Sequence, residues 1–280
     1  MGNKFQQVLL MSDFDNTILN TETARRNNLP VPDISDRNIE AIRYFIQEGG
    51  RFSVATGRGV TFFQEYVEKL PMNAPCVVFN GAAIYDYATS RYLEVLQLPE
   101  KVLRQLPEIY RRFPSVAIEV YDTEGVYVFQ SNLYSRQHHS VSKAEVKEVQ
   151  AISEFPTSAL KVIFDQNTEI LSEIKAWILE QEWSRDCEVV FSDKTLLEMT
   201  ISGTDKGQMV RQLAEILEIP GEHIYCVGDA DNDISMLRIA KEGFAPDNCF
   251  PAVRESGATI VADCDHDAIA EIIGILDKRY

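Results

Sequence analysis

Two aspartates follow an apolar run near the start of the chain. Asp13 and Asp15 come after "QVLLMS" and are followed at once by Asn16 and Thr17. Like charges at the end of a buried strand have two explanations. They can belong to a solvated turn, where Asp and Asn are favoured, or they can flank a bound cation. The pair alone does not distinguish the two.

Other predicted strands also end in polar groups. "ATGR" at 55–58 follows one strand, "FNG" at 79–81 a second and "VGDADND" at 227–233 a third. Lys206 in "GTDKG" begins a predicted helix. Ligands of open parallel sheets bind beyond the carboxyl ends of the strands, so we expect these groups to converge at one edge.

Convergence would crowd four carboxylates, those of Asp13, Asp15, Asp229 and Asp233, into a small volume. Two unit charges about 4 Å apart repel by about 4 kcal/mol at an effective dielectric constant near 20. A divalent cation removes this conflict. An all-oxygen ligand set suits Mg²⁺, which leaves coordination positions for water and for substrate phosphate.

The elements around these groups alternate between strand and helix. "RFSVAT" and "APCVVFN" read as strands, and "SDRNIEAIRYFIQEGG", with Ser35 as its cap, and "GVTFFQEYVEKL" read as helices. A β-α-β-α-β order predicts a parallel, doubly wound sheet. The same alternation returns after Gly203 with "KGQMVRQLAEILEI", "HIYCVG" and "NDISMLRIA".

The middle of the chain has a different pattern. "VAIEVYDTEGVYVFQ" and "CEVVFSDKTLLEMTIS" predict antiparallel hairpins. "ALKVIFDQ" reads as a further strand, and Asn167 can cap the helix after it, whereas Pro107 is expected to divide an earlier helix that begins near Lys101. We therefore predict an α/β fold: a doubly wound, Rossmann-like core formed by residues 1–84 and 197–280, with an inserted α+β cap domain at 85–196.

The ordered motifs resemble those of the haloacid dehalogenase (HAD) superfamily. "DFDNT", "VATGR", "GTDKG" and "GDADND" look like its first to fourth motifs, and "FNGAAIYD" is similar to the Cof-like branch with a large α/β cap between the second and third. The resemblance spans the core in order, while the insert matches only in size and position. One departure is Asn16, where Gly is common.

The resemblance implies a role for each motif residue. Asp13 would be the nucleophile that forms an aspartyl-phosphate, and Asp15 the general acid and base. Mg²⁺ would be held by the Asp13 carboxylate, the Asp15 backbone carbonyl and Asp229, with Asp233 supporting it through water or orienting Lys206. The phosphate-binding set would be Thr56, Gly57, Lys206 and Asn232.

The implied function is a Mg²⁺-dependent phosphatase that hydrolyses a small phosphomonoester, most simply a sugar phosphate. A phosphosugar mutase is an alternative, because phosphomannomutases carry a comparable cap. A non-catalytic phosphate-sensing module is a third. Such receiver-like modules are single small domains whose phosphorylated Asp follows the acidic pair, so the motif order here is against this interpretation.

Composition limits the partners. The formal net charge of −16 disfavours nucleic acid and anionic membranes, and no apolar run approaches the roughly 18 residues of a membrane span. The N-terminal apolar stretch is too short for a signal peptide. The five cysteines form no CxxC pair, so we expect reduced core thiols in a cytosolic protein. The oligomeric state cannot be predicted.

Several residues near the motifs have simpler interpretations. Arg58 is expected to be a structural residue or to support the groups that do chemistry, and not to act as a catalyst itself. Asp231 is expected to cap the helix after it. Asn80 and Gly81 either simply end a strand or have a substrate-binding or core-closing role. His138 and His139 are predicted to lie in a surface loop, since adjacent side chains point in different directions.

Overall fold

Two units share the chain in the computed structural model, which describes residues 3–27, 29–140 and 145–280. The core unit comprises Met1–Glu94 and Asp205–Tyr280, and the insert unit comprises Val95–Thr204. Both boundaries lie further along the chain than those predicted at 84/85 and 196/197. The reason is strand pairing: β5 (Arg91–Val95) pairs with β4 (Ala83–Asp86) of the core unit, and β11 (Leu196–Ile201) pairs with strands of the insert.

The core unit is built on a parallel sheet, which confirms the predicted fold class. β1 lies between β12 and β2, with Met11 opposite both Cys226 and Ser53. Every residue of β1 is buried, as expected for a strand covered on both faces. The strand order is β14-β13-β12-β1-β2, with bounds β1 Leu9–Ser12, β2 Arg51–Val54, β12 Ile224–Val227, β13 Glu242–Pro246 and β14 Thr259–Val261.

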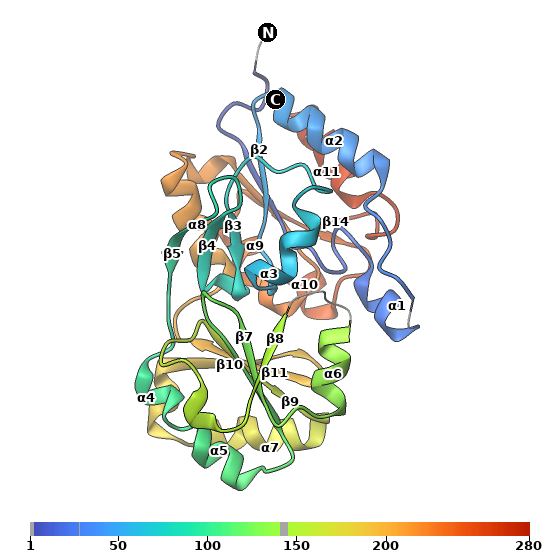
Figure 1. The fold of residues 1–280 in the computed structure, drawn as a ribbon. Coiled ribbons are helices and arrows are strands. Elements are labelled where there is room, and N and C mark those ends of the chain that lie inside the picture. Colours follow the sequence, from blue (N-terminus) through green and yellow to red (C-terminus); the bar gives the residue numbers. More distant parts are fainter. Residues whose placement is uncertain (1–2, 28, 141–144) are drawn as a thin grey trace. The chain divides into compact units, whose positions relative to one another are not determined.

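Helices cover both faces of this sheet (Figure 1). α2 (Asp36–Gln47) packs against α11 (Ala268–Asp277), and α8 (Lys206–Ile216) packs against α9 (Ile234–Ile239) on the other face. The Ser35 hydroxyl accepts a hydrogen bond from the Asn38 amide at 3.1 Å and caps α2 as predicted. The shorter core helices are α1 (Thr21–Arg26), α3 (Val60–Phe63) and α10 (Pro251–Glu255).

The third predicted strand lies at the edge of the parallel sheet and begins a second, antiparallel one. β3 (Cys76–Val78) runs parallel to the end of β2, as predicted, through the Ala55–Val77 bridge and a hydrogen bond from the Thr56 amide to the Val77 carbonyl at 2.9 Å. Its ladder partner is β4, with which it pairs antiparallel in a separate sheet of order β3-β4-β5. The chain reverses directly after β3, where Phe79, Asn80 and Gly81 have φ values of +54°, +57° and +101°. That reversal makes a hairpin instead of a helical crossover.

The insert unit contains a mixed sheet of order β10-β11-β9-β6-β7-β8. The predicted hairpins β6–β7 and β10–β11 are antiparallel, whereas β7 and β8 run parallel on either side of α6. The bounds are β6 Ala117–Tyr121, β7 Val126–Phe129, α6 Leu133–Ser140, β8 Val146–Val149, β9 Lys161–Asp165 and β10 Cys187–Asp193.

One face of the insert sheet is apolar and the other is polar. Ile118 and Val120 of β6 belong to a buried cluster formed with α4 (Glu100–Leu103), α5 (Leu106–Arg112) and α7 (Thr168–Leu179). Side chains alternate along a strand, so Glu119 and Tyr121 project from the opposite face. Pro107 lies in the first turn of α5, after a break that separates it from α4, and Asn167 caps α7.

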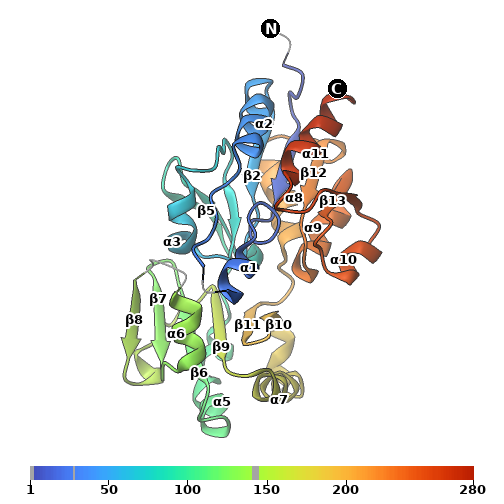
Figure 2. The same ribbon diagram turned by 90° about the vertical axis from the view of Figure 1, so that its right-hand side faces the viewer.

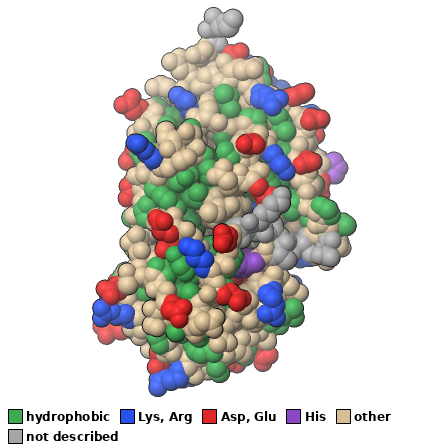
Figure 3. All heavy atoms as spheres, in the orientation of Figure 1, with side chains coloured by type: hydrophobic (Ala, Val, Ile, Leu, Met, Phe, Trp, Pro, Cys, Tyr) green, Lys and Arg blue, Asp and Glu red, His purple; other side chains and the backbone are tan. Residues whose placement is uncertain are grey.

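Two further expectations can be compared with the structure. All five cysteines are unpaired and buried, in agreement with the prediction of core thiols. Within the described ranges no helix is both long and apolar enough to cross a bilayer. On the face drawn in Figure 3, acidic and basic side chains are interspersed.

Candidate functional site

Lys206 links two acids of the predicted site. Its ammonium donates to Oδ1 of Asp13 and to Oδ1 of Asp233, both at 2.6 Å, and the side chain is 1% exposed. Lys206 is the first residue of α8, directly after Asp205, whose carboxylate caps the helix by accepting from the Gln208 amide at 2.8 Å. The cap therefore determines where this lysine enters the site.

Two glycines let other backbone segments approach Lys206 closely. A Cβ on Gly81 would lie 2.5 Å from the carbonyl oxygen of Asp205, and one on Gly207 would lie 2.5 Å from that of Ser235. The Gly207 amide also donates to the Ser235 hydroxyl at 3.1 Å. For Gly81 the structure favours the core-closing role, because its backbone packs against the start of α8.

Three carboxylates gather at the carboxyl ends of β1 and β12. One oxygen from each of Asp13, Asp229 and Asp233 lies within 4.8 Å of the others. The Thr17 hydroxyl lies 3.3 Å from Oδ2 of Asp13 and 3.2 Å from Oδ1 of Asp229, but its single hydrogen can serve only one of them. Oδ2 of Asp233 accepts from the amides of Asp229 and Ala230, both at 3.0 Å.

Negative charge exceeds positive charge in this cluster. Burial raises the pKa of Asp229 to about 9 and that of Asp13 to about 7; the neighbouring carboxylates add to both shifts and Lys206 opposes them. Burial by itself would lower the pKa of Lys206, but the charges of Asp13 and Asp233 outweigh it and raise the pKa. The three carboxylates offer more oxygen acceptors than there are hydrogen-bond donors around them, and they carry surplus negative charge. Both properties fit a divalent cation such as Mg²⁺.

Asp15 does not join these carboxylates, contrary to the predicted crowding of four acids. Arg58 donates from Nε to Oδ2 at 2.9 Å and from Nη2 to Oδ1 at 2.8 Å, and Thr21 adds a bond to Oδ1 at 2.7 Å. Burial would raise the pKa of Asp15, but the charge and hydrogen bonds of Arg58 prevail, and the pKa is lowered. Of the atoms of Asp15, the backbone carbonyl oxygen alone is still predicted to bind the metal, because Arg58 and Thr21 occupy the carboxylate.

Asn80 connects the other predicted substrate-binding residues. Thr56 is fully buried; its hydroxyl accepts from the Arg58 amide at 3.1 Å and its carbonyl accepts from the Asn80 amide at 3.0 Å. The exposed Asn232 donates to Oδ1 of Asn80 at 3.0 Å. A Cβ on Gly57 would lie 2.9 Å from the same oxygen. Asn232 therefore contacts Asn80, and no direct bond from it to Asp13 or Lys206 is found in the described part of the chain.

The predicted capping role of Asp231 is wrong. Asp231 begins the 3-10 turn Asp231–Asp233 and is exposed, while Ala230 holds the cap position. The amides at this position bond instead to Asp233, three and four residues further along the chain. Asp233 thus holds both this turn and Lys206.

Thr17 was missed from the sequence, and Arg58 has the supporting role expected of it, with a partner that was not predicted. Thr17, four residues after Asp13, touches both Asp13 and Asp229, and its place in the "DFDNT" motif was a usable signal. Arg58 binds Asp15 from 43 residues away, and its guanidinium lies over the rings of Phe14 and Tyr66 at 5.3 and 5.0 Å. No local pattern indicated that pairing.

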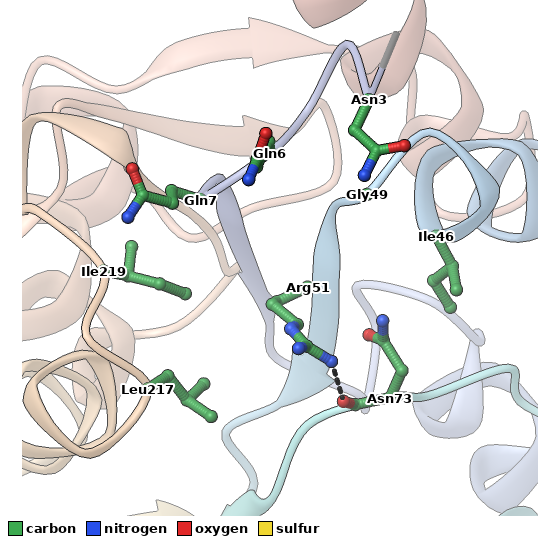
Figure 4. A pocket seen from close by; sticks show the side chains of 9 residues that line it. All are labelled: Asn3, Gln6, Gln7, Ile46, Gly49, Arg51, Asn73, Leu217 and Ile219. Carbon is green, nitrogen blue, oxygen red and sulfur yellow. Dashed lines mark hydrogen bonds between the residues drawn. The ribbon is translucent and has the colours of Figure 1, made fainter. Parts of the chain in front are cut away.

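A cavity of about 360 Å³ lies elsewhere in the core unit (Figure 4). Gln6 and Gln7, just before β1, and Gly49 and Arg51, at the start of β2, contribute to its wall. Arg51 donates to the backbone carbonyl of Asn73 at 3.3 Å. This cavity is at the amino ends of the strands, whereas the carboxylates are at the carboxyl ends, so it is not the candidate site.

Comparisons with known proteins cover nearly the whole chain. A family model described as haloacid dehalogenase-like hydrolase matches residues 10–273. A 5-amino-6-(5-phospho-D-ribitylamino)uracil phosphatase of Bacillus subtilis is 24% identical, covering 95% of this chain and 96% of the relative. A pyridoxal phosphate phosphatase of Escherichia coli is 24% identical, covering 93% and 95%.

Solved structures agree with the fold. A haloacid dehalogenase-like hydrolase from Bacteroides thetaiotaomicron superposes with a TM-score of 0.83 at 22% identity, covering 96% of this chain and 99% of that one. At this identity the likeness supports the arrangement of the elements and not a substrate.

Proposed function

The chain belongs to the haloacid dehalogenase-like hydrolases, and from that premise we propose that it is a Mg²⁺-dependent phosphatase of a small phosphomonoester. The observation that carries this proposal is the position of Asp13, whose carboxylate lies between the Lys206 ammonium and the Asp229 carboxylate. The two curated relatives described above are phosphatases by name, which supports the reaction type.

The first half-reaction uses both acids of the first motif. A carboxylate oxygen of Asp13 attacks phosphorus, the bond from phosphorus to the ester oxygen breaks, and Asp15 gives its proton to the departing alcohol. In the second half, water attacks the aspartyl-phosphate and gives a proton to Asp15. The bond from phosphorus to Asp13 then breaks and releases inorganic phosphate.

The remaining residues bind and neutralise charge. Lys206 is anchored by Asp233 and can bind a phosphoryl oxygen, and its charge favours the ionised form of Asp13. Thr56, Gly57 and Asn232 are the other proposed phosphate-binding positions. Mg²⁺, held by Asp13, Asp229 and the Asp15 carbonyl, would neutralise the charge of the phosphoryl group.

The Arg58 ion pair constrains the role of Asp15. A carboxylate held by two guanidinium bonds is a poor proton donor, because these bonds stabilise its ionised form. Asp15 therefore has to leave Arg58, wholly or in part, before it can deliver a proton to the leaving group. We propose that arrival of the phosphorylated substrate at Asp13 accompanies this exchange.

The substrate we propose is a phosphorylated sugar or a similar small polyol in the cytosol. One relative is named for a phosphorylated ribityl compound and the other for pyridoxal phosphate, and both are small phosphomonoesters. The net charge of −16 opposes a nucleic-acid substrate, which is consistent with a small metabolite.

A panel of sugar, sugar-alcohol, nucleotide and pyridoxal phosphates, assayed with Mg²⁺ and ranked by kcat/KM, tests the proposal. Asp13→Asn should lower kcat by at least about 10³-fold, as expected for a nucleophile. Asp231→Asn removes an exposed acid of the same size near the site and should leave the rate unchanged. Equal rates for wild type and Asp13→Asn would refute the mechanism, and transfer of phosphate to an added sugar in preference to water would indicate a mutase.

A further inference from the structure

A second group of metal-binding side chains lies within the insert unit, and the proposed phosphatase chemistry does not use it. We propose that this cluster binds a divalent transition-metal ion, with Zn²⁺ as the best fit. Glu119, His138 and His139 bring three ligand atoms together. The fourth ligand in this proposal is Asp165, which lies beside His138.

The two carboxylates come from adjacent strands of the sheet. Glu119 of β6 lies opposite Ile163 of β9, and Asp165 of β9 lies opposite Ala117 of β6. Both side chains project from the face away from the apolar cluster, which takes Ile118 from β6 and Phe164 from β9. Both are also completely buried, with 0% of their surface exposed.

The two histidines come from the helix that lies beside this face, α6 (Figure 2). Asn132 holds the start of α6 by accepting from the amides of Tyr134 and Ser135, and its Nδ2 donates to the backbone carbonyl of Asp165 at 2.7 Å. Because the beginning of the helix is attached to β9, its later turn reaches Glu119. The predicted surface loop at His138 and His139 is therefore wrong: both residues are helical and partly buried.

Both imidazoles reach a single oxygen of Glu119. His138 uses Nδ1, which is 3.3 Å from Oε1, and His139 uses Nε2, which contacts the same atom. Neighbouring residues on a helix differ by about 100° in direction. His138 uses the ring nitrogen closer to its backbone, Nδ1, and His139 uses the more distant one, Nε2. The two rings can therefore reach the same point in spite of that angle. The three ligand atoms lie within 4.8 Å of one another.

Asp165 supplies an independent reason to expect a ligand. Both of its carboxylate oxygens are buried, and neither has a hydrogen-bond partner among the residues that the structure describes. Oδ1 lies 3.7 Å from Nδ1 of His138, so the carboxylate is directed at the cluster. A buried polar group without a partner costs free energy that a bound cation would recover.

The charges on this face also favour a divalent ion. Glu119, Asp165 and Glu198 are acidic, and Lys161 is the basic residue among them, with its ammonium 3.2 Å from Glu198. With neutral imidazoles the sum is minus two, which a divalent cation balances. Two imidazoles and two carboxylates suit Zn²⁺ and similar transition metals better than Mg²⁺, which prefers oxygen ligands.

Four protein ligands around Zn²⁺ complete a tetrahedral shell and leave no position for a substrate. The ion would therefore have a structural role, joining α6 to β6 and β9 inside the insert unit. Its binding free energy would add to the stability of this unit.

Zn²⁺ titration of the full chain by calorimetry, with Mg²⁺ in excess to occupy the carboxylate site of the core unit, tests the proposal. Wild type should bind one Zn²⁺, and its thermal midpoint should rise with Zn²⁺. Co²⁺ in place of Zn²⁺ should give the intense visible absorption of a tetrahedral site. Asp165→Asn and the double variant His138→Gln/His139→Gln should each weaken Zn²⁺ binding by at least about 100-fold, since even outer partners of metal ligands contribute 10–100-fold.

His266→Gln is the matched control, because His266 pairs with Asp263 in the core unit and its side chain is exposed. It should bind Zn²⁺ as wild type does. The wild-type titration and the Co²⁺ spectrum do not depend on whether any variant folds. Absence of Zn²⁺ binding by Mg²⁺-saturated wild type would overturn the proposal, and so would equal binding by wild type and a folded Asp165→Asn variant. Neither result would affect the phosphatase assay.

Discussion

Arg58 and Asp15 form a two-point ion pair in which Nε and Nη2 of the guanidinium bind different oxygens of the carboxylate at 2.9 and 2.8 Å. The guanidinium also lies over the neighbouring rings of Phe14 and Tyr66. Arg58 therefore positions the proposed general acid and stabilises its ionised form.

Replacing Arg58 should change the pH dependence of catalysis. Asp15 must be protonated to assist the leaving group, and Arg58 lowers its pKa. In Arg58→Gln the pKa of Asp15 in the free enzyme should rise, so the high-pH limb of the kcat/KM profile should move upward by about one unit or more, the usual effect of a nearby opposite charge. Arg58→Lys keeps the positive charge but cannot bind both carboxylate oxygens in the same way. Its high-pH limb should therefore lie between those of wild type and Arg58→Gln.

The pH profiles of kcat/KM for the three proteins, measured with one phosphomonoester and Mg²⁺, provide the check. Superimposable high-pH limbs for wild type and Arg58→Gln would mean that Arg58 does not control the proton on the catalytic acid. A lower kcat/KM with no movement of the limb would point to positioning alone.

Thr17 is expected to matter through its hydroxyl. It lies between Asp13 and Asp229, at 3.3 and 3.2 Å. Thr17→Val keeps the shape of the side chain but removes a charge-assisted hydrogen bond worth roughly 1.5–3 kcal/mol, so kcat/KM should fall about 10- to 100-fold. Thr17→Ser keeps the hydroxyl and should stay close to wild type. If the valine and serine variants had equal activity, the hydroxyl would have no part in the site.

Much of the core could be predicted because its signals are local. The buried run Leu9–Ser12 reads as a strand covered on both faces, and Ser35 and Asn167 cap their helices from within a few residues. The convergence of Asp13, Asp229 and Lys206 follows from one rule about parallel strands, since each residue lies next to the carboxyl end of a strand or at the start of a helix.

The features that could not be predicted depend on contacts between distant residues. The sequence around His138 and His139 is typical of a surface segment. Their burial depends on Glu119 of β6, about twenty positions earlier, which both histidines contact in the folded chain. The reversal from β3 to the antiparallel β4 depends on left-handed backbone at Phe79 and Asn80. The sequence "FNG" does not predict this reversal, because it is equally typical of a simple strand end. Tertiary pairing decides such cases, and it leaves little trace in a single sequence.

Asn16 occupies a position where backbone conformation limits the residue type. Its φ is +57°, its side chain accepts from the Glu22 amide at 2.9 Å and its carbonyl accepts from Asn248 at 2.7 Å. Gly is common at this position in the first motif of the HAD superfamily. The left-handed backbone explains why both Gly and Asn suit it. Asn16→Ala should lose about 1–2 kcal/mol more stability in urea unfolding than Asn16→Gly, because only alanine has a Cβ to clash. Equal losses would show that the side-chain hydrogen bond, not the backbone, sets the requirement.

The metal-free carboxylate cluster should make stability fall as pH rises. Asp229 keeps its proton in the folded chain up to a pKa of about 9, whereas an ordinary aspartate ionises near 3.8. Between these values the folded state binds more protons than the unfolded state, so the free energy of unfolding decreases with pH, by at most about 1.4 kcal/mol per unit for one group. In chelator, the thermal midpoint of wild type should drop between pH 6 and pH 8.5. Millimolar Mg²⁺ should reduce the drop, because the ion replaces the proton.

Asp229→Asn separates this effect from other titrating groups, because asparagine has a similar shape but cannot ionise. The difference between the midpoints of the variant and of wild type, both in chelator, should grow in favour of the variant as pH rises. Parallel curves over that range would mean that Asp229 ionises in the folded chain without cost. The surplus of negative charge that makes the cluster suitable for a divalent cation would then be absent.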